Sequence, residues 1–375
     1  MTGSETGKHG EYALLTPGPL TTTATVKQAM LRDLSTWDSD YNDRVRHLRS
    51  KLVELAAGKS SRSRYTSVLM QGSGTFAVES VVGSAVPENG KLLIVENGAY
   101  GRRMADIARV LRISHEVLSC GEDEIPDAEA VSRTLETCPD VTHAAIIHCE
   151  TTTGILNDIA SVGSVVKAHG KTLIVDAMSS FGGIPINAGE LGVDFLISSS
   201  NKCVQGVPGF GFVIAERSAL ENCEGNARSL SLDLYDQWRV LENEWKWRFT
   251  SPTHAVLAFI QALAELDEEG GIPARFARYK ALQARVASGM EELGFKTFLK
   301  RELQSPIITS FHYPKVGNFV FSDLYEHVKS DGYVLYPGKI SNADTFRIGN
   351  IGDIDMSVIE GLLASVRAFV RGLSD

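Results

Sequence analysis

The chain has 375 residues, 43% of them hydrophobic and 22% charged, and its formal net charge is −9. This composition predicts two packed domains and excludes a disordered chain, while the lack of a basic, aromatic-rich run argues against nucleic-acid binding. The five cysteines contain no Cys-x-x-Cys pair, which argues against a disulfide framework or a structural zinc site and indicates a reducing compartment.

The start of the chain carries no targeting signal that we can identify. Residues 1–12 are polar, without the apolar core of a signal peptide, and no apolar run approaches the roughly 20 residues that span a bilayer. We therefore expect a cytoplasmic protein with a disordered start. Residues 14–19, with two prolines and a glycine, predict a stiff extended arm, and helices are expected at 25–30 and 42–57.

A glycine-rich segment follows the strand expected at residues 65–70. Ser73 and Thr75 alternate with glycines before a helix that is expected to run to residue 86, and backbone N–H groups at a helix start bind anions. Gly72, Gly74 and Ala77 also fit the Gly-x-Gly-x-x-Ala pattern of a dinucleotide site, with an acidic strand end about 20 residues on. An NAD-dependent dehydrogenase is therefore an alternative, although it leaves the chemistry further along the chain unexplained.

In the middle of the chain, expected strands alternate with expected helices. Strands are expected at 92–95, 115–118, 144–149 and 173–176, and helices at 104–111, 127–135 and 159–168. This alternation predicts a parallel sheet covered on both faces. Tyr100 follows one strand end, where it could stack on a flat ring or simply join the core. Thr152 follows another, where its hydroxyl could bond a ligand oxygen or water.

Asp176 and Lys202 are the main candidates for catalysis. Asp176 ends one buried strand and Lys202 follows the next, expected at 193–197. Because the carboxyl ends of parallel strands line the ligand crevice, both side chains are expected to face one cavity. A desolvated lysine can attack a carbonyl, and a carboxylate can keep a pyridine nitrogen protonated, which together suit pyridoxal 5′-phosphate. The alternatives are a surface lysine and a helix cap.

The character of the sequence changes after residue 216. An aromatic and hydroxyl-rich stretch contains Thr250, and helices expected at 255–268 and 276–293 lead into an α+β module. In that module, Arg347 lies in an apolar strand and needs either a protein carboxylate or an anionic substrate as partner.

Together these motifs resemble the class-V aminotransferases of fold type I, and in particular their phosphonate-specific branch. The lysine and aspartate motifs are specific for the superfamily, and the resemblance covers nearly the whole chain. The segments that carry it are residues 15–19, 72–75, 97–101, 150–154, 175–180, 200–209 and 248–254.

The resemblance implies an α/β fold with a mostly parallel central sheet, in a large domain (residues 1–262 with the arm) and a smaller C-terminal α+β domain (residues 263–375). It also implies pyridoxal 5′-phosphate as cofactor, a homodimer with shared active sites, and transfer of an amino group from 2-aminoethylphosphonate to pyruvate, yielding phosphonoacetaldehyde and L-alanine.

Carried over residue by residue, the resemblance assigns each candidate a role. Lys202 is the Schiff-base lysine and Asp176 the partner of the pyridine nitrogen. Ser73, Gly74 and Thr75 bind the cofactor phosphate, and Thr250 reaches the phosphate in the neighbouring subunit. Tyr100 stacks on the ring and Thr152 bonds near the ring's phenolic oxygen. Arg347 binds the anionic end of the substrate. No metal is implied.

Two further alternatives within the family stay open at this point. One is a class-V transaminase that acts on serine or alanine with glyoxylate. The other is a desulfurase, which needs a reactive cysteine on a mobile loop, and Cys203 beside Lys202 is poorly placed for that role.

Overall fold

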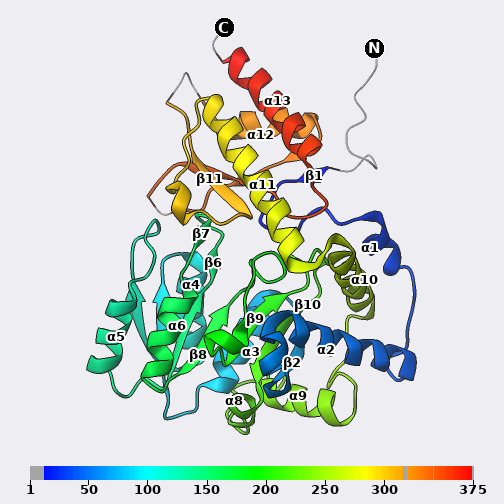
Figure 1. Ribbon diagram of the computed structural model, residues 1–375, viewed down its shortest axis with the longest axis vertical. Coiled ribbons are helices and arrows are strands. Elements are labelled where there is room, and N and C mark those ends of the chain that lie inside the picture. The colour runs from blue at the N-terminus through cyan, green and yellow to red at the C-terminus, as the bar shows by residue number, and fades with distance from the viewer. Residues whose placement is uncertain (1–11, 316–318, 341, 374–375) are drawn as a thin grey trace.

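A computed structural model describes residues 12–315, 319–340 and 342–373 of the protein. A seven-stranded sheet forms its centre (Figure 1). Its order is β2-β10-β9-β8-β5-β3-β4. The strands are β2 (Tyr65–Gln71), β3 (Lys91–Glu96), β4 (Ser114–Ser119), β5 (His143–Ile147), β8 (Thr172–Asp176), β9 (Phe195–Ser199) and β10 (Phe210–Glu216). β10 pairs antiparallel with β2 and β9, and the other pairings are parallel, which confirms the predicted mostly parallel sheet.

Helices cover this sheet because its inner strands are mainly apolar, with polar residues near their ends, and must be buried on both faces. α2 (Ser39–Ser61) and α9 (Leu234–Asn243) pack on β2, α3 (Gly74–Ala85) on β9 and β10, α4 (Ala99–Val110) on β3, and α6 (Ile159–Ala168) on β8. The other helices of this part are α1 (Ala24–Ala29), α5 (Ala128–Thr137), α7 (Ala188–Leu191), α8 (Arg217–Glu221) and α10 (Thr253–Glu269). Within the described ranges, no helix is both long and apolar enough to cross a bilayer.

The C-terminal module is built on an antiparallel sheet in the order β11-β14-β13. Its elements are β11 (Ile308–His312), β13 (Tyr336–Pro337), β14 (Thr345–Gly349), α11 (Gly271–Glu292), α12 (Phe321–Ser330) and α13 (Met356–Gly372). It has a hydrophobic core of its own, in which Phe346 packs on Phe295 and Phe311. The expected domain boundary at residue 262 falls inside α10 and stays a prediction.

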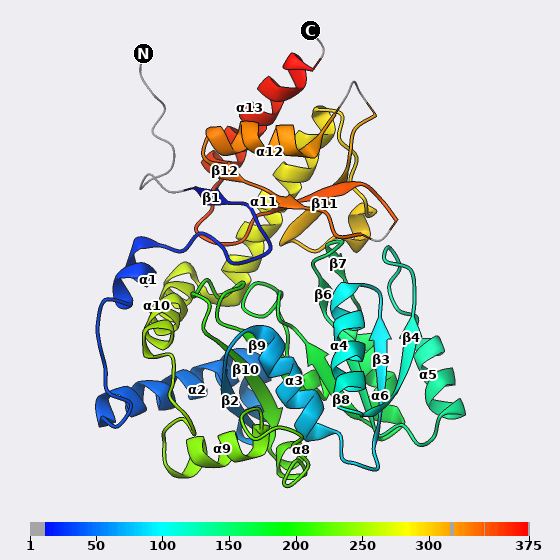
Figure 2. The same cartoon turned by 180° about the vertical axis from the view of Figure 1, so that it is seen from behind.

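The N-terminal arm joins the two parts of the molecule, and Figure 2 shows it passing between them. β1 (Ala13–Leu14) pairs in parallel with β12 (Tyr333–Val334) of the C-terminal module, and Leu15 is buried in the module's core. The chain then turns toward the large sheet. The arm is thus anchored on the C-terminal module while its tip reaches the large sheet. The disorder predicted for residues 1–12 concerns a segment that lies, except for Tyr12, outside the described residues.

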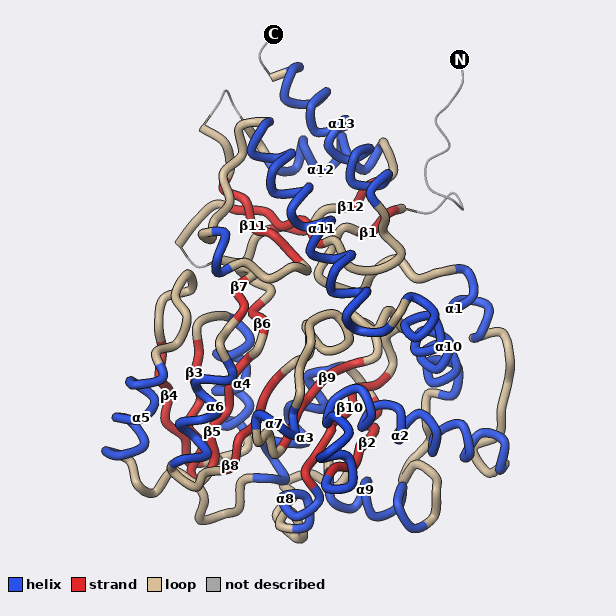
Figure 3. Tube along the Cα trace, in the orientation of Figure 1, coloured by secondary structure: helices blue, strands red, loops and turns tan. Residues whose placement is uncertain are grey.

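Several local predictions differ from the structure: the helix expected from residue 276 begins at Gly271, and two further differences lie at the carboxyl edge of the sheet. The helix expected from residue 104 begins at Ala99, because the side chain of Glu150, about 50 residues further on, accepts a hydrogen bond from its first turn. The strand expected at 144–149 ends at Ile147, and the chain continues into a small hairpin of β6 (Cys149–Glu150) and β7 (Ile155–Leu156). Loops and this hairpin lie between the large sheet and the C-terminal module (Figure 3).

Candidate active site

Lys202 lies in the turn between β9 and β10, where the chain leaves a buried strand. Its Nζ donates a hydrogen bond of 2.8 Å to the backbone oxygen of Pro17 in the arm. Burial lowers the pKa of Lys202 to about 8, although the charge of Asp176 acts in the opposite direction. Part of the amine is therefore neutral near neutral pH, which is the form that attacks carbonyl groups.

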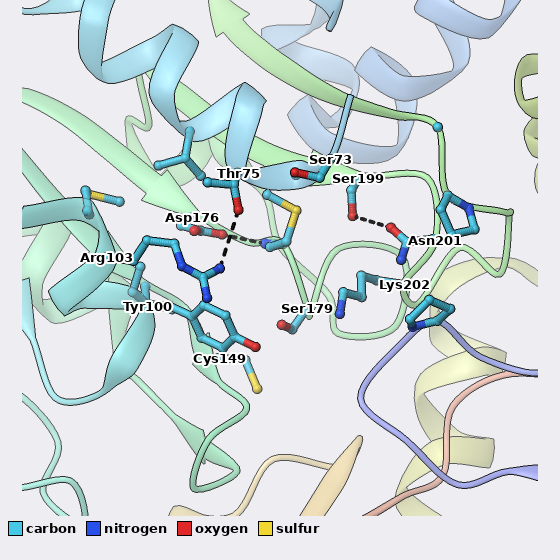
Figure 4. A pocket seen from close by; sticks show the side chains of 18 residues that line it. Ser73, Thr75, Tyr100, Arg103, Cys149, Asp176, Ser179, Ser199, Asn201 and Lys202 are labelled. Carbon is cyan, nitrogen blue, oxygen red and sulfur yellow. Dashed lines mark hydrogen bonds between the residues drawn. The ribbon is translucent and has the colours of Figure 1, made fainter. Parts of the chain in front are cut away.

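Asp176 is the last residue of β8, which pairs in parallel with β9. Burial raises its pKa to about 6, while the N–H of Met178, which donates to Oδ1 at 2.8 Å, and the charges of Arg103 and Lys202 lower it. Asp176 and Lys202 line one cavity of about 330 Å³ and point into it (Figure 4). The structure thus brings together the two residues that the sequence placed at neighbouring strand ends.

The start of α3 forms one wall of this cavity, with Ser73, Gly74 and Thr75 among its lining residues. The hydroxyl of Ser73 makes no capping bond to the helix, so the first N–H groups and this hydroxyl face the cavity together. Any side chain at position 74 would place its Cβ 2.2 Å from Sδ of Met178. A larger residue at this position would therefore require the end of the Met178 side chain to move.

Tyr100 and Arg103 line the cavity from the first two turns of α4. The guanidinium of Arg103 lies 5.1 Å from the ring centroid of Tyr100, within the range of a cation–π contact. Its Nη1 also donates to the hydroxyl of Thr75 at 3.4 Å. Figure 4 shows the guanidinium between Thr75 and the tyrosine ring.

Three other predicted residues are absent from the described lining of the cavity. Thr152 is buried, and its hydroxyl donates to a carboxyl oxygen of Glu150 at 2.8 Å. Thr250 is exposed, in the loop between α9 and α10. Arg347 lies on β14 beside the cavity, where it contributes to the electrostatic environment of Lys202.

The hydrogen bonds described for Arg347 go to backbone oxygens and not to a carboxylate. Its guanidinium donates to the backbone oxygens of Thr151 at 2.8 Å and of Pro337 at 2.9 Å, and lies 4.9 Å from the ring centroid of Tyr336. Among the described residues, no carboxylate pairs with it within salt-bridge distance. A buried arginine held by carbonyl groups alone is suited to receive an anion.

Two residues of the site escaped the sequence reasoning. Arg103 lies one helical turn after Tyr100, a spacing that puts both on one face once the helix is known to start at Ala99. Glu150 is completely buried behind this face, and burial raises its pKa to about 7. The signal for Arg103 was the i, i+3 spacing, whereas nothing local in the sequence links Glu150 to Tyr100.

The donors of the cavity fit a phosphorylated aldehyde with a basic ring nitrogen. N–H groups and hydroxyls at the start of α3 suit a phosphate, the carboxylate of Asp176 suits a ring nitrogen, and the amine of Lys202 suits an aldehyde. Gly74 supports the same interpretation, because its missing side chain is what keeps the helix start open toward the cavity.

Comparison with known proteins gives a consistent result. The family model described as aminotransferase class-V matches residues 24–332. A protein of Vibrio vulnificus, named 2-aminoethylphosphonate–pyruvate transaminase, is 58% identical over 358 residues, covering 95% of this chain and 97% of its own. A protein of Bacillus cereus with the same name is 56% identical over 356 residues, again covering 95% of this chain and 97% of its own.

Solved structures share the architecture at much lower identity. Pyridoxamine-pyruvate aminotransferase from Mesorhizobium loti superposes with a TM-score of 0.87 at 23% identity, covering 98% of this chain and 94% of that one. Alanine–glyoxylate aminotransferase from Nostoc sp. gives a TM-score of 0.87 at 22% identity, covering 99% and 98%. These likenesses establish the fold.

Proposed function

The chain belongs to the class-V aminotransferases, and from this premise we propose that it moves the amino group of 2-aminoethylphosphonate to pyruvate with pyridoxal 5′-phosphate as cofactor. The products are phosphonoacetaldehyde and L-alanine, so the reaction is a step in phosphonate degradation. The observation that carries the choice of substrates is the identity of 56–58%, over 95% of the chain, to transaminases named for this pair.

The residues that would hold the cofactor follow from the shape of the cavity. Ser73, Gly74 and Thr75 bind its phosphate at the start of α3, Asp176 pairs with the ring nitrogen, and Tyr100 covers the ring. When bound, pyridoxal phosphate supplies an aldehyde that joins to an amine and a ring that takes up the electrons of a broken C–H bond. The resemblance also assigns Thr152 to the ring's phenolic oxygen, which it would reach only by leaving its bond to Glu150.

Lys202 moves the proton in this proposal. Once the substrate amine has replaced it, its Nζ takes a proton from the carbon that bears the amino group and later returns a proton, as base and then as acid. A pKa of about 8 suits both tasks near neutral pH. Asp176, with a pKa of about 6, is mostly ionised at neutral pH, which favours a protonated ring nitrogen.

Arg347 binds the anionic end of either substrate. A guanidinium can grip a phosphonate or a carboxylate with two parallel hydrogen bonds. Among the described residues, Arg347 makes three hydrogen bonds, to two backbone oxygens, which leaves two of its five N–H groups for this contact. One cation can therefore serve both half-reactions.

We also assign Thr250 to the active site of a second copy of the chain. Thr250 is exposed and lies beside Phe249, which is 48% exposed, while Leu230 is 75% exposed. Exposed apolar side chains that gather in one patch suit an interface. In a homodimer with shared sites, the hydroxyl of Thr250 would reach the partner's cofactor phosphate.

The dehydrogenase alternative is wrong, because the chain belongs to an aminotransferase family. The acidic residue at the strand end that matched the dinucleotide pattern, Glu96, takes part in the packing of the sheet instead. Glu96 is buried, and its Oε1 accepts a hydrogen bond of 2.9 Å from the hydroxyl of Ser119. The glycine-rich segment serves the start of α3 instead.

The proposal is tested by assaying the purified protein with three substrate pairs in parallel. We expect alanine to form from 2-aminoethylphosphonate and pyruvate, with much lower turnover for serine or alanine with glyoxylate. The Lys202→Ala variant should lose at least about 10²–10⁴-fold in kcat, the contribution of a positioned acid–base group. Turnover with glyoxylate but none with the phosphonate would retain transamination and overturn the substrate assignment.

A further inference from the structure

The side chain of Glu150 lies at the start of α4, although the two are 50 residues apart in sequence. Oε2 accepts a hydrogen bond from the backbone N–H of Tyr100 at 3.1 Å, and the N–H of Gly101 also donates to this carboxyl group. Oε1 accepts the hydroxyl of Thr152 at 2.8 Å. The first N–H groups of a helix have no partner inside it, so a carboxylate from a hairpin caps this helix.

The helix cannot provide this cap itself. Its N-cap residue is Gly98, which has no side chain to accept a hydrogen bond. A Cβ at position 98 would lie 2.3 Å from Cγ and 2.4 Å from Cδ of Glu150. The glycine therefore leaves the space that the carboxylate of Glu150 fills, and the two positions are sterically complementary.

The capped turn carries the residues that face the cavity. Tyr100 and Arg103 both line it, and the hydroxyl of Thr151 donates to the phenolic oxygen of Tyr100 at 3.3 Å. The hairpin thus fixes Tyr100 at its backbone through Glu150 and at its ring through Thr151. The backbone oxygen of Thr151 also accepts a hydrogen bond from the guanidinium of Arg347.

The charges around Glu150 suit a carboxylate in this place. A negative charge is stabilised at a helix N-terminus by the helix dipole. Arg347 and Arg102 are the cations that interact with it, while Asp176 and the phenol of Tyr100 are the acidic groups nearby. In the hydrogen bonds described for Glu150, both carboxyl oxygens act as acceptors, as the oxygens of an ionised carboxyl group do.

We propose that Glu150 is a positioning residue of the active site, whose carboxylate holds the first turn of α4 and thereby keeps Tyr100, and Arg103 one turn later, at the wall of the cavity that would hold the cofactor. Glu150 touches neither substrate nor cofactor. This inference rests on the proposed function, because it assigns Glu150 a task only if the cavity binds pyridoxal phosphate.

The test compares Glu150→Gln with Glu122→Gln at pH 8.5, above the pKa of Glu150. Glu122 is a matched control, because it pairs with Arg102 of the same helix at 2.6 Å but does not line the cavity. The readouts are the dissociation constant for pyridoxal phosphate, the visible circular dichroism of the bound cofactor, and the melting temperature of the cofactor-free protein. Glutamine removes the negative charge at the start of α4 and replaces one of the two acceptor oxygens with an NH₂ group, which has nothing to accept with.

We expect Glu150→Gln to bind the cofactor about tenfold more weakly and to lose more than half of its visible circular dichroism, while Glu122→Gln matches the wild type in both. A lower melting temperature with unchanged affinity and dichroism would overturn the inference and leave a purely structural cap. If Glu150→Gln does not fold, Gly98→Ala gives the same test, because it displaces the carboxylate without removing it. A wild-type protein that binds no pyridoxal phosphate at all would instead refute the proposed function.

Discussion

Lys202 shows how a single residue acquires its reactivity from its surroundings. A lysine in water has a pKa near 10.5, and burial lowers this one to about 8. Asp176 is shifted the other way, to about 6, because burial disfavours its charge as well. The same loss of water thus gives a partly neutral amine and a carboxylate that is still ionised at neutral pH.

The pKa of Lys202 predicts how the cofactor-free protein reacts with pyridoxal phosphate. Because only the neutral amine attacks, the rate of attachment should rise about tenfold per pH unit below pH 8 and level off above it. Stopped-flow absorbance measures this rate, with Lys202→Ala as the background from surface lysines. A rate that keeps rising to pH 10 would mean that the amine is not desolvated.

The same shift predicts a change in stability with a definite sign. The unfolded chain binds more protons than the folded one between the folded pKa of about 8 and the ordinary value of 10.5. The buried cation therefore costs stability in full below pH 8, and this cost fades as the pH rises through that window. Cofactor-free Lys202→Met should be more stable than the wild type by about 1–3 kcal/mol at pH 7.

Urea unfolding at two pH values checks this prediction. The advantage of Lys202→Met should be present at pH 7 and shrink by pH 10. The comparison is made without cofactor, because covalent attachment would stabilise only the wild type. A Met variant that is less stable at pH 7 would show that the hydrogen bond to Pro17 outweighs the cost of burial.

Among the secondary-structure elements, α3 begins at Gly74, whose missing side chain leaves room for Met178 beside the cavity. Gly74→Ala would place a methyl group 2.2 Å from Sδ and 2.7 Å from Cε of Met178. We expect it to reduce stability by about 1–3 kcal/mol, as overpacking does, and to weaken pyridoxal phosphate binding. Fluorescence titration of the cofactor-free protein measures the second effect.

Gly372→Ala provides the control, since its Cβ would meet nothing within 4 Å. This variant should keep the wild-type affinity and stability to within about 0.5 kcal/mol. Equal affinity in both variants would mean that the helix start is not a phosphate site.

How well the sequence predicted an element depended on whether its determinants are local. α6 was predicted at 159–168, where the structure has it, because its apolar pattern and its glycine stop are contiguous. The start of α4 was missed because Gly98 looks like a loop residue, and the cap that makes it helical comes from Glu150. The hairpin of β6 and β7 was missed because each strand has only two residues.

The candidate site divides in the same way. Asp176 and Lys202 were predictable, because the ends of neighbouring parallel strands meet at one edge of a sheet. The contact between Lys202 and Pro17 was not, since it depends on the arm crossing from the C-terminal module to the large sheet. Such long-range contacts leave no periodic pattern in the sequence.

For the molecule as a whole, the proposed role of Thr250 implies that each active site is shared between two subunits. Lys202→Ala and Thr250→Glu should each be inactive alone, the second because a carboxylate repels the cofactor phosphate. Refolded together, half of the dimers are mixed, and one of their two sites has both Lys202 and Thr250 intact. We expect about a quarter of the wild-type activity.

The recovery of activity distinguishes the two possible arrangements. If Thr250 served the site of its own chain, every site in the mixed dimer would carry one defect, and the mixture would stay inactive. An affinity tag on one of the two variants provides the control for subunit exchange, because the tag retains the untagged variant only if mixed dimers form. A monomer by light scattering would also contradict the shared site.

An absorption spectrum shows whether the protein passes an amino group from a phosphonate to pyruvate through Lys202. The protein loaded with pyridoxal phosphate is mixed with 2-aminoethylphosphonate in the absence of pyruvate. We predict that the band of the lysine-linked cofactor disappears and that pyruvate restores it. A band that ignores the phosphonate but is lost with serine or alanine would contradict the substrate assignment, and no band at all would contradict the account as a whole.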